Sequence, residues 1–173
     1  NGLNSTAFPS GVGAIPVEVT EAGSPLVFRR RELLPNSAGP GKYRGGFAQV
    51  VEVESRAGLP FTVSAATFDR LQNPARGRHG GKPGSPGAFG LVGGEVFHTK
   101  AVHTVPPGDR LHAQLPGGGG FGDPLARDAH EVADEVKAGL VSVAAARASY
   151  GVVVTEGGEI DAAGTQALRA GQS

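Results

Sequence analysis

The sequence predicts an α+β protein that is mainly β: an antiparallel, β-rich body of sandwich or barrel type, followed by a small helical tail. Up to residue 115, short apolar runs alternate with a period of two between Gly- and Pro-rich turns, which is typical of antiparallel strands. Beyond residue 124 the apolar period becomes helical. Four consecutive glycines, residues 117–120, separate the two patterns. Because glycine is costly to order, this run is a boundary and a candidate functional segment.

The composition limits the classes of function. The 173 residues carry 16 basic and 16 acidic side chains, so a broad nucleic-acid or anionic-membrane surface is not expected. Cysteine is absent, which excludes disulfides and thiolate metal sites. No apolar run approaches the roughly 20 residues that span a bilayer, and we expect a cytoplasmic protein. The chain has no Met and opens on Asn1, so we expect it to be a piece of a longer protein.

We divide the chain into a loop over residues 1–14, a β-rich domain over 15–123 and a helical tail over 124–173. Residues 47–67 are expected to form an antiparallel hairpin, and Gly93-Gly94 suits a two-residue hairpin turn. The strands predicted from alternation and β-branched content span residues 16–20, 26–34, 47–54, 61–67, 88–92, 95–99, 101–105 and 110–115.

Helix signals follow in the tail. Asp128 with Glu131 three residues later is a variant of the capping box, and Val132 and Val136 continue an apolar face. Ser142 is placed to cap a helix over residues 143–149. Gly151 is placed to end that helix. We expect a short strand over residues 151–155 and a last helical turn over 162–170.

Three polar residues in predicted turns are candidate binding residues. Arg44 precedes two glycines, so its guanidinium and the nearby backbone N–H groups suit a carboxylate or phosphate. Asp69 and Arg70 end a predicted strand and can position a polar substrate group. The alternatives are a tight turn at Arg44, and an ion pair or Asx cap at Asp69 and Arg70 that anchors the following loop.

The long loop over residues 73–87 contains almost no core-forming residues and is rich in Gly and Pro. Loops of this length in a compact domain are usually functional or disordered. His79 lies in this loop beside Arg76, Arg78 and Lys82, and it is a candidate proton donor or anion contact. The other histidines show no metal-ligand spacing, so we predict no metal site in this segment.

The glycine run formally satisfies the dinucleotide fingerprint G-x-G-x-x-G. However, the next helix begins late, near Asp128, and another helix follows where a parallel strand should carry the ribose-binding acid. We therefore do not expect a dinucleotide fold, and the sequence also has no P-loop and no G-x-S-x-G motif. The backbone amides of Gly117, Gly118, Gly119 and Gly120 remain candidate donors to an oxyanion or phosphate.

Several motifs together resemble the C-terminal part of the hydantoinase B/oxoprolinase family. The most specific are Gly-Lys-Tyr-Arg-Gly-Gly at residues 41–46 and Pro-Gly-Gly-Gly-Gly-Phe-Gly-Asp-Pro at 116–124. The resemblance covers about residues 15–169 and includes Asp69-Arg70, Gly80–Gly84 and Tyr150–Val153. Family members often have Tyr where Phe121 stands and an acid where Ala126 stands, and these changes keep the shape.

The resemblance implies a subunit of an ATP-dependent enzyme that opens cyclic amides such as hydantoins or 5-oxoproline. The partner it implies is a hydantoinase A-type subunit, or fused half, that handles ATP. Any divalent metal is expected in the missing upstream region, which is also a partner of this segment. No cofactor, catalytic residue or metal ligand is thus assigned here, and the fragment alone is expected to be inactive.

Two alternatives stay open. The segment can instead be a non-catalytic assembly module of such a complex, or part of an ATP-dependent ketone carboxylase, since acetone and acetophenone carboxylases include related members. Hydantoin, N-methylhydantoin, 5-oxoproline and a ketone all remain possible substrates. In each case the partner activates the substrate through phosphorylation, and this segment supplies walls, loops and subunit contacts.

Overall fold

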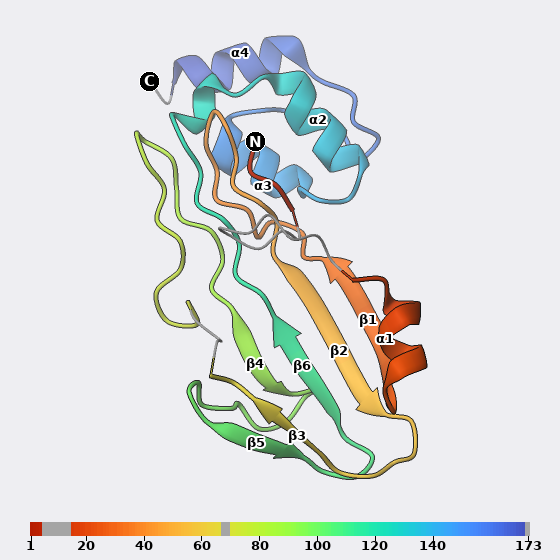
Figure 1. Ribbon diagram of the computed structural model, residues 1–173. Helices are drawn as coiled ribbons and strands as arrows, with labels where there is room; N and C mark the ends of the chain where they lie inside the picture. Colours follow the sequence, from red (N-terminus) through yellow and green to blue (C-terminus); the bar gives the residue numbers. More distant parts are fainter. Residues whose placement is uncertain (5–14, 67–69, 172–173) are drawn as a thin grey trace.

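A four-stranded antiparallel sheet forms the lower half of the molecule in the computed structural model, which describes residues 1–4, 15–66 and 70–171 (Figure 1). Its strand order is β1-β2-β6-β4. The strands are β1 (Leu26–Leu33), β2 (Gln49–Ser55), β6 (Arg110–Gln114) and β4 (Ala88–Leu91). A second antiparallel sheet pairs β3 (Phe61–Ser64) with β5 (Val102–Val105). The predicted antiparallel α+β architecture is confirmed, and the two sheets are open.

The strand register separates the two faces of the larger sheet. Leu111 of β6 lies opposite Val53 of β2 and Leu91 of β4, so this face is apolar. Phe89 and Leu111 form one buried core with Val105, which lies at the end of β5 in the smaller sheet. The smaller sheet therefore covers the apolar face, as the period of two requires.

The predicted hairpin over residues 47–67 is wrong. Strand β2 is hydrogen-bonded to β1 on one side and to β6 on the other, so both of its edges are occupied. Strand β3 pairs with β5 instead, with Phe61 opposite Val105. The turn between β2 and β3 thus carries the chain from one sheet to the other, and alternation alone does not reveal the partner of a strand.

Three of the predicted strands do not form. Residues 17–20 belong to helix α1 (Val17–Gly23), which is preceded by Pro16 as its N-cap and lies beside β1 (Figure 1). None of the residues of α1 is buried, so its alternating valines do not form the buried face of a strand. The Glu21 carboxylate accepts a 2.7 Å hydrogen bond from the Phe28 N–H, which holds the helix against β1. Residues 95–99 and 151–155 contribute only isolated bridges, Gly90 to Val96 and Val154 to Ile160.

The helical tail follows the prediction. After the short 3₁₀ helix η1 (Pro124–Ala126) come α2 (Ala129–Lys137), α3 (Val143–Tyr150) and α4 (Ala162–Ala170). The side chains of Asp128, Ser142 and Asp161 accept hydrogen bonds from the first turns of these three helices. Gly151 ends α3 at φ 61°, a left-handed conformation that glycine reaches without strain.

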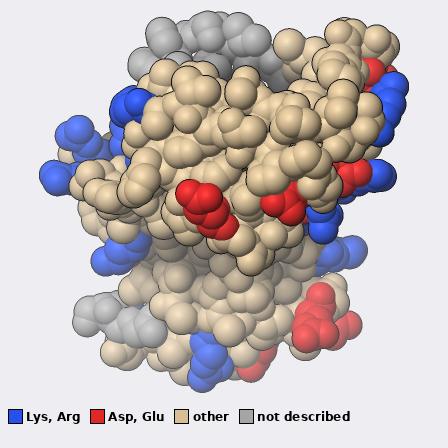
Figure 2. Space-filling view, turned by 90° about the horizontal axis from the view of Figure 1, so that it is seen from below, with Lys and Arg blue, Asp and Glu red and all other residues tan. Residues whose placement is uncertain are grey.

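The tail shares its core with the β-rich part. Val132 and Val136 of α2 and Ala146 of α3 are buried in one cluster with Phe47 and Ala38, which precede β2 in the chain. The division at residues 123 and 124 stays a prediction. None of the helices in the described ranges is long and apolar enough to cross a membrane. Seen from the β3–β5 end, charges of both signs are interspersed on a mostly uncharged surface (Figure 2).

Val132 and Val19 provide a matched test of this shared core, because both are valines in helices but Val132 is 0% exposed and Val19 is 62% exposed. We expect Val132→Ala to lower the free energy of unfolding by about 2 kcal/mol through lost burial and an added cavity. Val19→Ala should change it by less than about 0.5 kcal/mol. Urea denaturation measures both, and equal losses would contradict the assignment of the core.

Candidate functional site

Three extended segments run side by side between the larger sheet and the tail helices (Figure 1). We call them the glycine bundle, and they comprise residues 37–46, 75–87 and 115–122. The Gly39 N–H donates to the Gly118 carbonyl at 2.8 Å, and the Gly118 N–H donates to the Gly46 carbonyl at 2.8 Å. The Gly120 N–H donates to the Lys82 carbonyl at 2.9 Å. The bundle is therefore cross-linked by backbone hydrogen bonds outside the two sheets.

The glycines are required because backbone packs directly on backbone. A Cβ atom at Gly45 would lie 1.9 Å from the Gly118 carbonyl oxygen. A Cβ at Gly120 would lie 2.0 Å from the Pro40 oxygen, and real Cβ atoms essentially never come closer than 3.0 Å to such atoms. Any side chain at these positions would force the segments apart. Glycine is used here because it permits close backbone approach.

Most of the predicted amide donors of the glycine run are hydrogen-bonded inside the bundle. Gly117 donates its N–H to the Ser85 carbonyl at 3.0 Å, and Gly118 and Gly120 donate to Gly46 and Lys82. A Cβ at Gly119 would lie 2.2 Å from the Arg76 oxygen, so this residue also faces the bundle interior. Binding of an anion by these amides stays a prediction, and three of the four N–H groups are engaged within the chain.

Arg44, the candidate binding residue in the motif at residues 41–46, contacts the tail. Its Nε donates a hydrogen bond to Oε1 of Glu135 in α2, and Nη1 donates to the Gly45 carbonyl at 2.8 Å. The guanidinium carbon lies 4.3 Å from the centre of the Phe47 ring, a cation–π contact. The side chain is 10% exposed, so Arg44 joins the bundle to the tail.

A second arginine completes this contact. Arg127 is 1% exposed, and its Nη2 lies 3.0 Å from Glu135 Oε1 and 2.8 Å from Glu131 Oε2. Its Nη1 donates to the Asn1 side-chain oxygen at 2.6 Å. We call Arg44, Arg127, Glu131 and Glu135 the charged cluster. Buried charges are stable where they are paired and hydrogen-bonded, and this cluster fixes the tail on the bundle.

The role of Arg127 and Glu135 was not predicted from the sequence. The available signal was spacing: Arg127, Glu131 and Glu135 recur every four residues, beside the apolar positions of α2. Tyr150 closes the cluster on the tail side, with the Arg127 guanidinium carbon 5.8 Å from its ring centre. Burial raises the pKa of the Tyr150 hydroxyl, although the positive charge of Arg127 acts in the opposite direction.

The remaining candidate residues lie apart from this cluster. Asp69 falls outside the described residues. Arg70 is exposed with φ 60°, and its carbonyl accepts a 3.1 Å hydrogen bond from the Gly87 N–H, which joins the two ends of the long loop. Within the described ranges, no hydrogen bond, ion pair or ring contact joins Arg70 to Arg44 or His79.

His79 lies at a tight turn at one end of the bundle. His79 and Gly80 have φ 50° and 93°, and the Gly81 N–H donates to the Arg78 carbonyl at 2.9 Å. The His79 ring centre is 4.8 Å from that of Phe121, which is 6.5 Å from the ring of Tyr43. We call Tyr43, His79 and Phe121 the aromatic tip. His79 was a candidate from the sequence, whereas the two rings that accompany it were not.

A second polar cluster lies on the larger sheet, opposite its apolar face. Glu52 of β2 is 8% exposed and is surrounded by three basic side chains. Arg30 Nη1 lies 3.4 Å from its carboxylate, Arg110 Nη1 3.5 Å and His112 Nδ1 3.5 Å. These groups come from β1 and β6, the two neighbours of β2, so the cluster ties three strands together.

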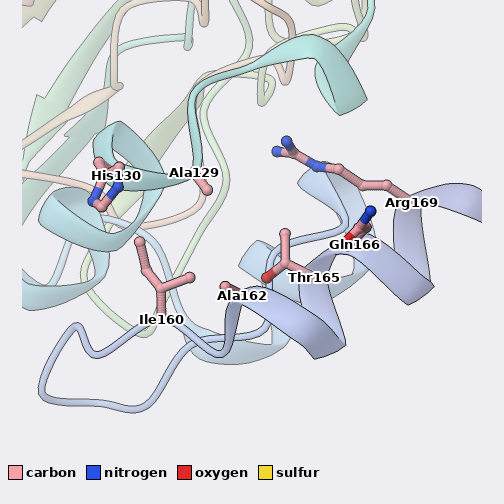
Figure 3. A pocket seen from close by; sticks show the side chains of 7 residues that line it. All are labelled: Ala129, His130, Ile160, Ala162, Thr165, Gln166 and Arg169. Carbon is pink, nitrogen blue, oxygen red and sulfur yellow. The ribbon is translucent and has the colours of Figure 1, made fainter.

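The tail contains an open pocket of about 360 Å³ between α2 and α4 (Figure 3). Figure 3 shows His130 and Ile160 toward one end and Gln166 and Arg169 toward the other. The Arg169 guanidinium donates to the Tyr150 carbonyl at 3.1 Å and to the Arg127 carbonyl at 2.7 Å. Arg169, on the polar wall of the pocket, therefore joins α4 to the end of α3 and to the segment before α2. In the part of the chain that the structure describes, no group of His, Asp and Glu is arranged to hold a metal ion.

The bundle can be tested with two glycines that differ in their surroundings. A Cβ at Gly45 meets backbone at 1.9 Å, whereas a Cβ at Gly23 meets nothing within 4 Å. We expect Gly45→Ala to lower the free energy of unfolding by about 3 kcal/mol or more, because the backbone must shift. Gly23→Ala should change it by less than about 1 kcal/mol. Thermal unfolding followed by circular dichroism compares them, and a tolerated Gly45→Ala would refute the packing.

The charged cluster offers a second matched pair. Glu135 and Glu131 both contact Arg127 Nη2, but their side chains are 11% and 52% exposed. Glu135→Gln should cost about 3–5 kcal/mol, because it leaves buried arginine charge uncompensated. Glu131→Gln should cost at most about 1 kcal/mol, as for an exposed pair. Urea denaturation reports both values, and a small effect of Glu135→Gln would show that the cluster does not fix the tail.

Comparison with known proteins identifies the family. The family model described as hydantoinase B/oxoprolinase matches residues 1–124. The chain is 36% identical over 163 residues to caprolactamase subunit beta of Pseudomonas jessenii, which covers 89% of this chain and 28% of that protein. It is 37% identical over 110 residues to 5-oxoprolinase 1 of Arabidopsis thaliana, covering 61% of this chain and 8% of that protein.

A solved structure agrees. The crystal structure of the ATP-dependent caprolactamase from Pseudomonas jessenii matches with a TM-score of 0.75 and 31% identity, over 92% of this chain and 29% of that chain. The chain thus spans less than a third of the length of these relatives. The family match includes the whole glycine bundle, and the chain belongs to the hydantoinase B/oxoprolinase family.

Proposed function

We propose that the chain is the C-terminal segment of a subunit of an ATP-dependent cyclic-amide hydrolase of the hydantoinase/5-oxoprolinase type, acting with a hydantoinase A-type partner that handles ATP. The observation that carries the proposal is the similarity to caprolactamase subunit beta, which extends over 89% of the chain and includes bundle and tail. Caprolactam, hydantoin and 5-oxoproline share one chemical feature, a ring amide. The substrate class is therefore a lactam or related cyclic amide.

The proposed reaction divides the chemistry between the subunits. The partner transfers the γ-phosphoryl group of ATP to the amide oxygen, and ADP leaves. Water adds to the activated carbon and the ring C–N bond breaks, which frees the amine and leaves an acyl phosphate. A second water hydrolyses the acyl phosphate to the carboxylate and inorganic phosphate. This segment binds no cofactor in the proposal, and any divalent metal is held by the upstream region. Because ATP is a cytoplasmic substrate, the proposal also places the enzyme in the cytoplasm.

The geometry supports a structural contribution from this segment. Arg44 is paired with Glu135, and the amides of Gly117, Gly118 and Gly120 are bonded to other backbone carbonyls. These groups hold the bundle and tail in one arrangement, on which loops and subunit contacts can be built. The segment then shapes the site and its assembly, and the reacting groups come from the partner and the upstream region.

Reconstitution of the intact subunit with its hydantoinase A-type partner tests the function. We expect ADP to form only when a cyclic amide and both subunits are present. The amount of ADP should equal the amount of ring-opened product. Hydantoin, N-methylhydantoin, 5-oxoproline and caprolactam are compared as substrates, and the 173-residue chain alone is the inactive control.

Acetone with bicarbonate is assayed in parallel, because a ketone carboxylase would consume ATP only with both. ADP formation that requires ketone and bicarbonate and ignores every cyclic amide would replace the proposed hydrolase by a carboxylase. Amide hydrolysis that proceeds without ATP would contradict it as well.

A further inference from the structure

The aromatic tip exposes large rings on a rigid backbone. Tyr43 is 52% exposed and Phe121 is 49% exposed. Their main chains exchange two hydrogen bonds, from the Tyr43 N–H to the Phe121 carbonyl at 3.0 Å and back at 2.9 Å. The glycine bundle beneath them is cross-linked by further backbone bonds, so the main chain that carries both rings is held in one conformation. Such preorganised aromatic residues lose little conformational entropy when they are bound.

The turn at His79 adds a third ring at a conformational cost. His79 and Gly80 both have positive φ, and a two-residue turn of this kind favours Asn-Gly. Asn36 also has positive φ, but a hydrogen bond offsets the conformational cost, because its side-chain oxygen accepts from the Ser142 N–H at 2.8 Å. The His79 side chain instead lies against Phe121. Strained residues of this kind concentrate at functional sites.

Basic residues neighbour the aromatic tip. Lys42 places Nζ 5.7 Å from the Tyr43 ring centre, and Arg78 is bridged to Phe121 through the backbone. Lys82 and Arg76 lie on the bundle segment that contacts Gly119 and Gly120. Within residues 42–43, 76–82 and 121–123, the exposed basic residues are Lys42, Arg76, Arg78 and Lys82, and the exposed acid is Asp123. These three segments therefore carry an excess of positive charge.

We propose that the aromatic tip and its four basic neighbours form the surface on which an acidic face of the ATP-handling partner subunit docks. The inference rests on the proposed function, which supplies that partner. Exposed Tyr, Phe and Arg side chains are enriched in subunit interfaces, where a few aromatic anchors carry most of the binding energy. The positive rim selects an acidic partner surface and speeds encounter with it. An interface within the subunit's own chain is the competing occupant.

The test uses the intact subunit and its intact partner, with Kd measured by biolayer interferometry at two salt concentrations. We expect Tyr43→Ala with Phe121→Ala to weaken binding at least about tenfold, because both anchors are lost. Lys42→Glu with Arg78→Glu should weaken it and reduce its salt dependence. The control pair, Val96→Ala with Val102→Ala, removes apolar side chains that are 77% and 69% exposed elsewhere and should leave Kd unchanged.

The variants keep the backbone hydrogen bonds of the tip, and circular dichroism verifies their folding. At saturating partner we expect kcat for ATP-dependent amide hydrolysis to be unchanged, since the tip docks and does not react. Unchanged Kd in both tip variants would overturn the inference while the proposed function stands. Unchanged Kd with a loss of kcat would also overturn it and would assign the tip to substrate. Unchanged Kd with a lower Tm of the isolated subunit than the control pair shows would assign the tip to the subunit's own upstream region.

Wild-type proteins that fail to associate would overturn the inference. If they also fail to hydrolyse cyclic amides together, the proposed function falls with it, so the wild-type assay separates the two failures.

Discussion

Direct contact between backbones is the constraint on which the rest of this structure depends. In the glycine bundle, carbonyl oxygens occupy the space where a Cβ atom would otherwise stand, at Gly45, Gly117 and Gly120 among others. A side chain at such a position cannot be accommodated by a change of rotamer, because the obstacle is main chain. The bundle brings together segments that are far apart in sequence, and it lies between the larger sheet and the tail.

The charged cluster extends this arrangement into the tail. Arg44 lies in the bundle and Arg127 at the end of η1, and both guanidinium groups donate to Oε1 of Glu135. Taking two cations and a carboxylate from water is costly, and a geometry that pairs them offsets much of that cost. Removing one member leaves the others uncompensated, so the cluster favours one position of the tail over its alternatives. The apolar core of Val132, Ala146 and Phe47 then supplies the main stabilisation.

The same framework connects structure to the proposed role. Hydrogen bonds that hold Gly118 and Gly120 inside the bundle also fix the neighbouring Phe121 and Tyr43 at its exposed end. A rigid scaffold with exposed aromatic and basic side chains is suited to recognition, which is the contribution proposed for this segment.

Local patterns in the sequence determined much of the fold. The caps at Asp128 and Ser142 and the terminal Gly151 predicted α2 and α3 correctly, because capping uses groups within a few residues of one another. Alternation predicted β1 and β6 for a similar reason. For the site, the sequence indicated Arg44, His79 and the glycine run as special, and the motifs indicated the family.

The tertiary structure alone decided what these residues meet. Strand β2 pairs with β1 and β6 and not with β3, although β3 follows it, since long-range pairing depends on which edges are free. In the sequence Glu135 is an ordinary helical acid, and only the fold brings it into contact with Arg44, 91 residues away. The glycines allow close approach, but only the fold specifies that the approaching group is another backbone. Sequence records the conformations each residue permits, and contacts between distant segments select among them.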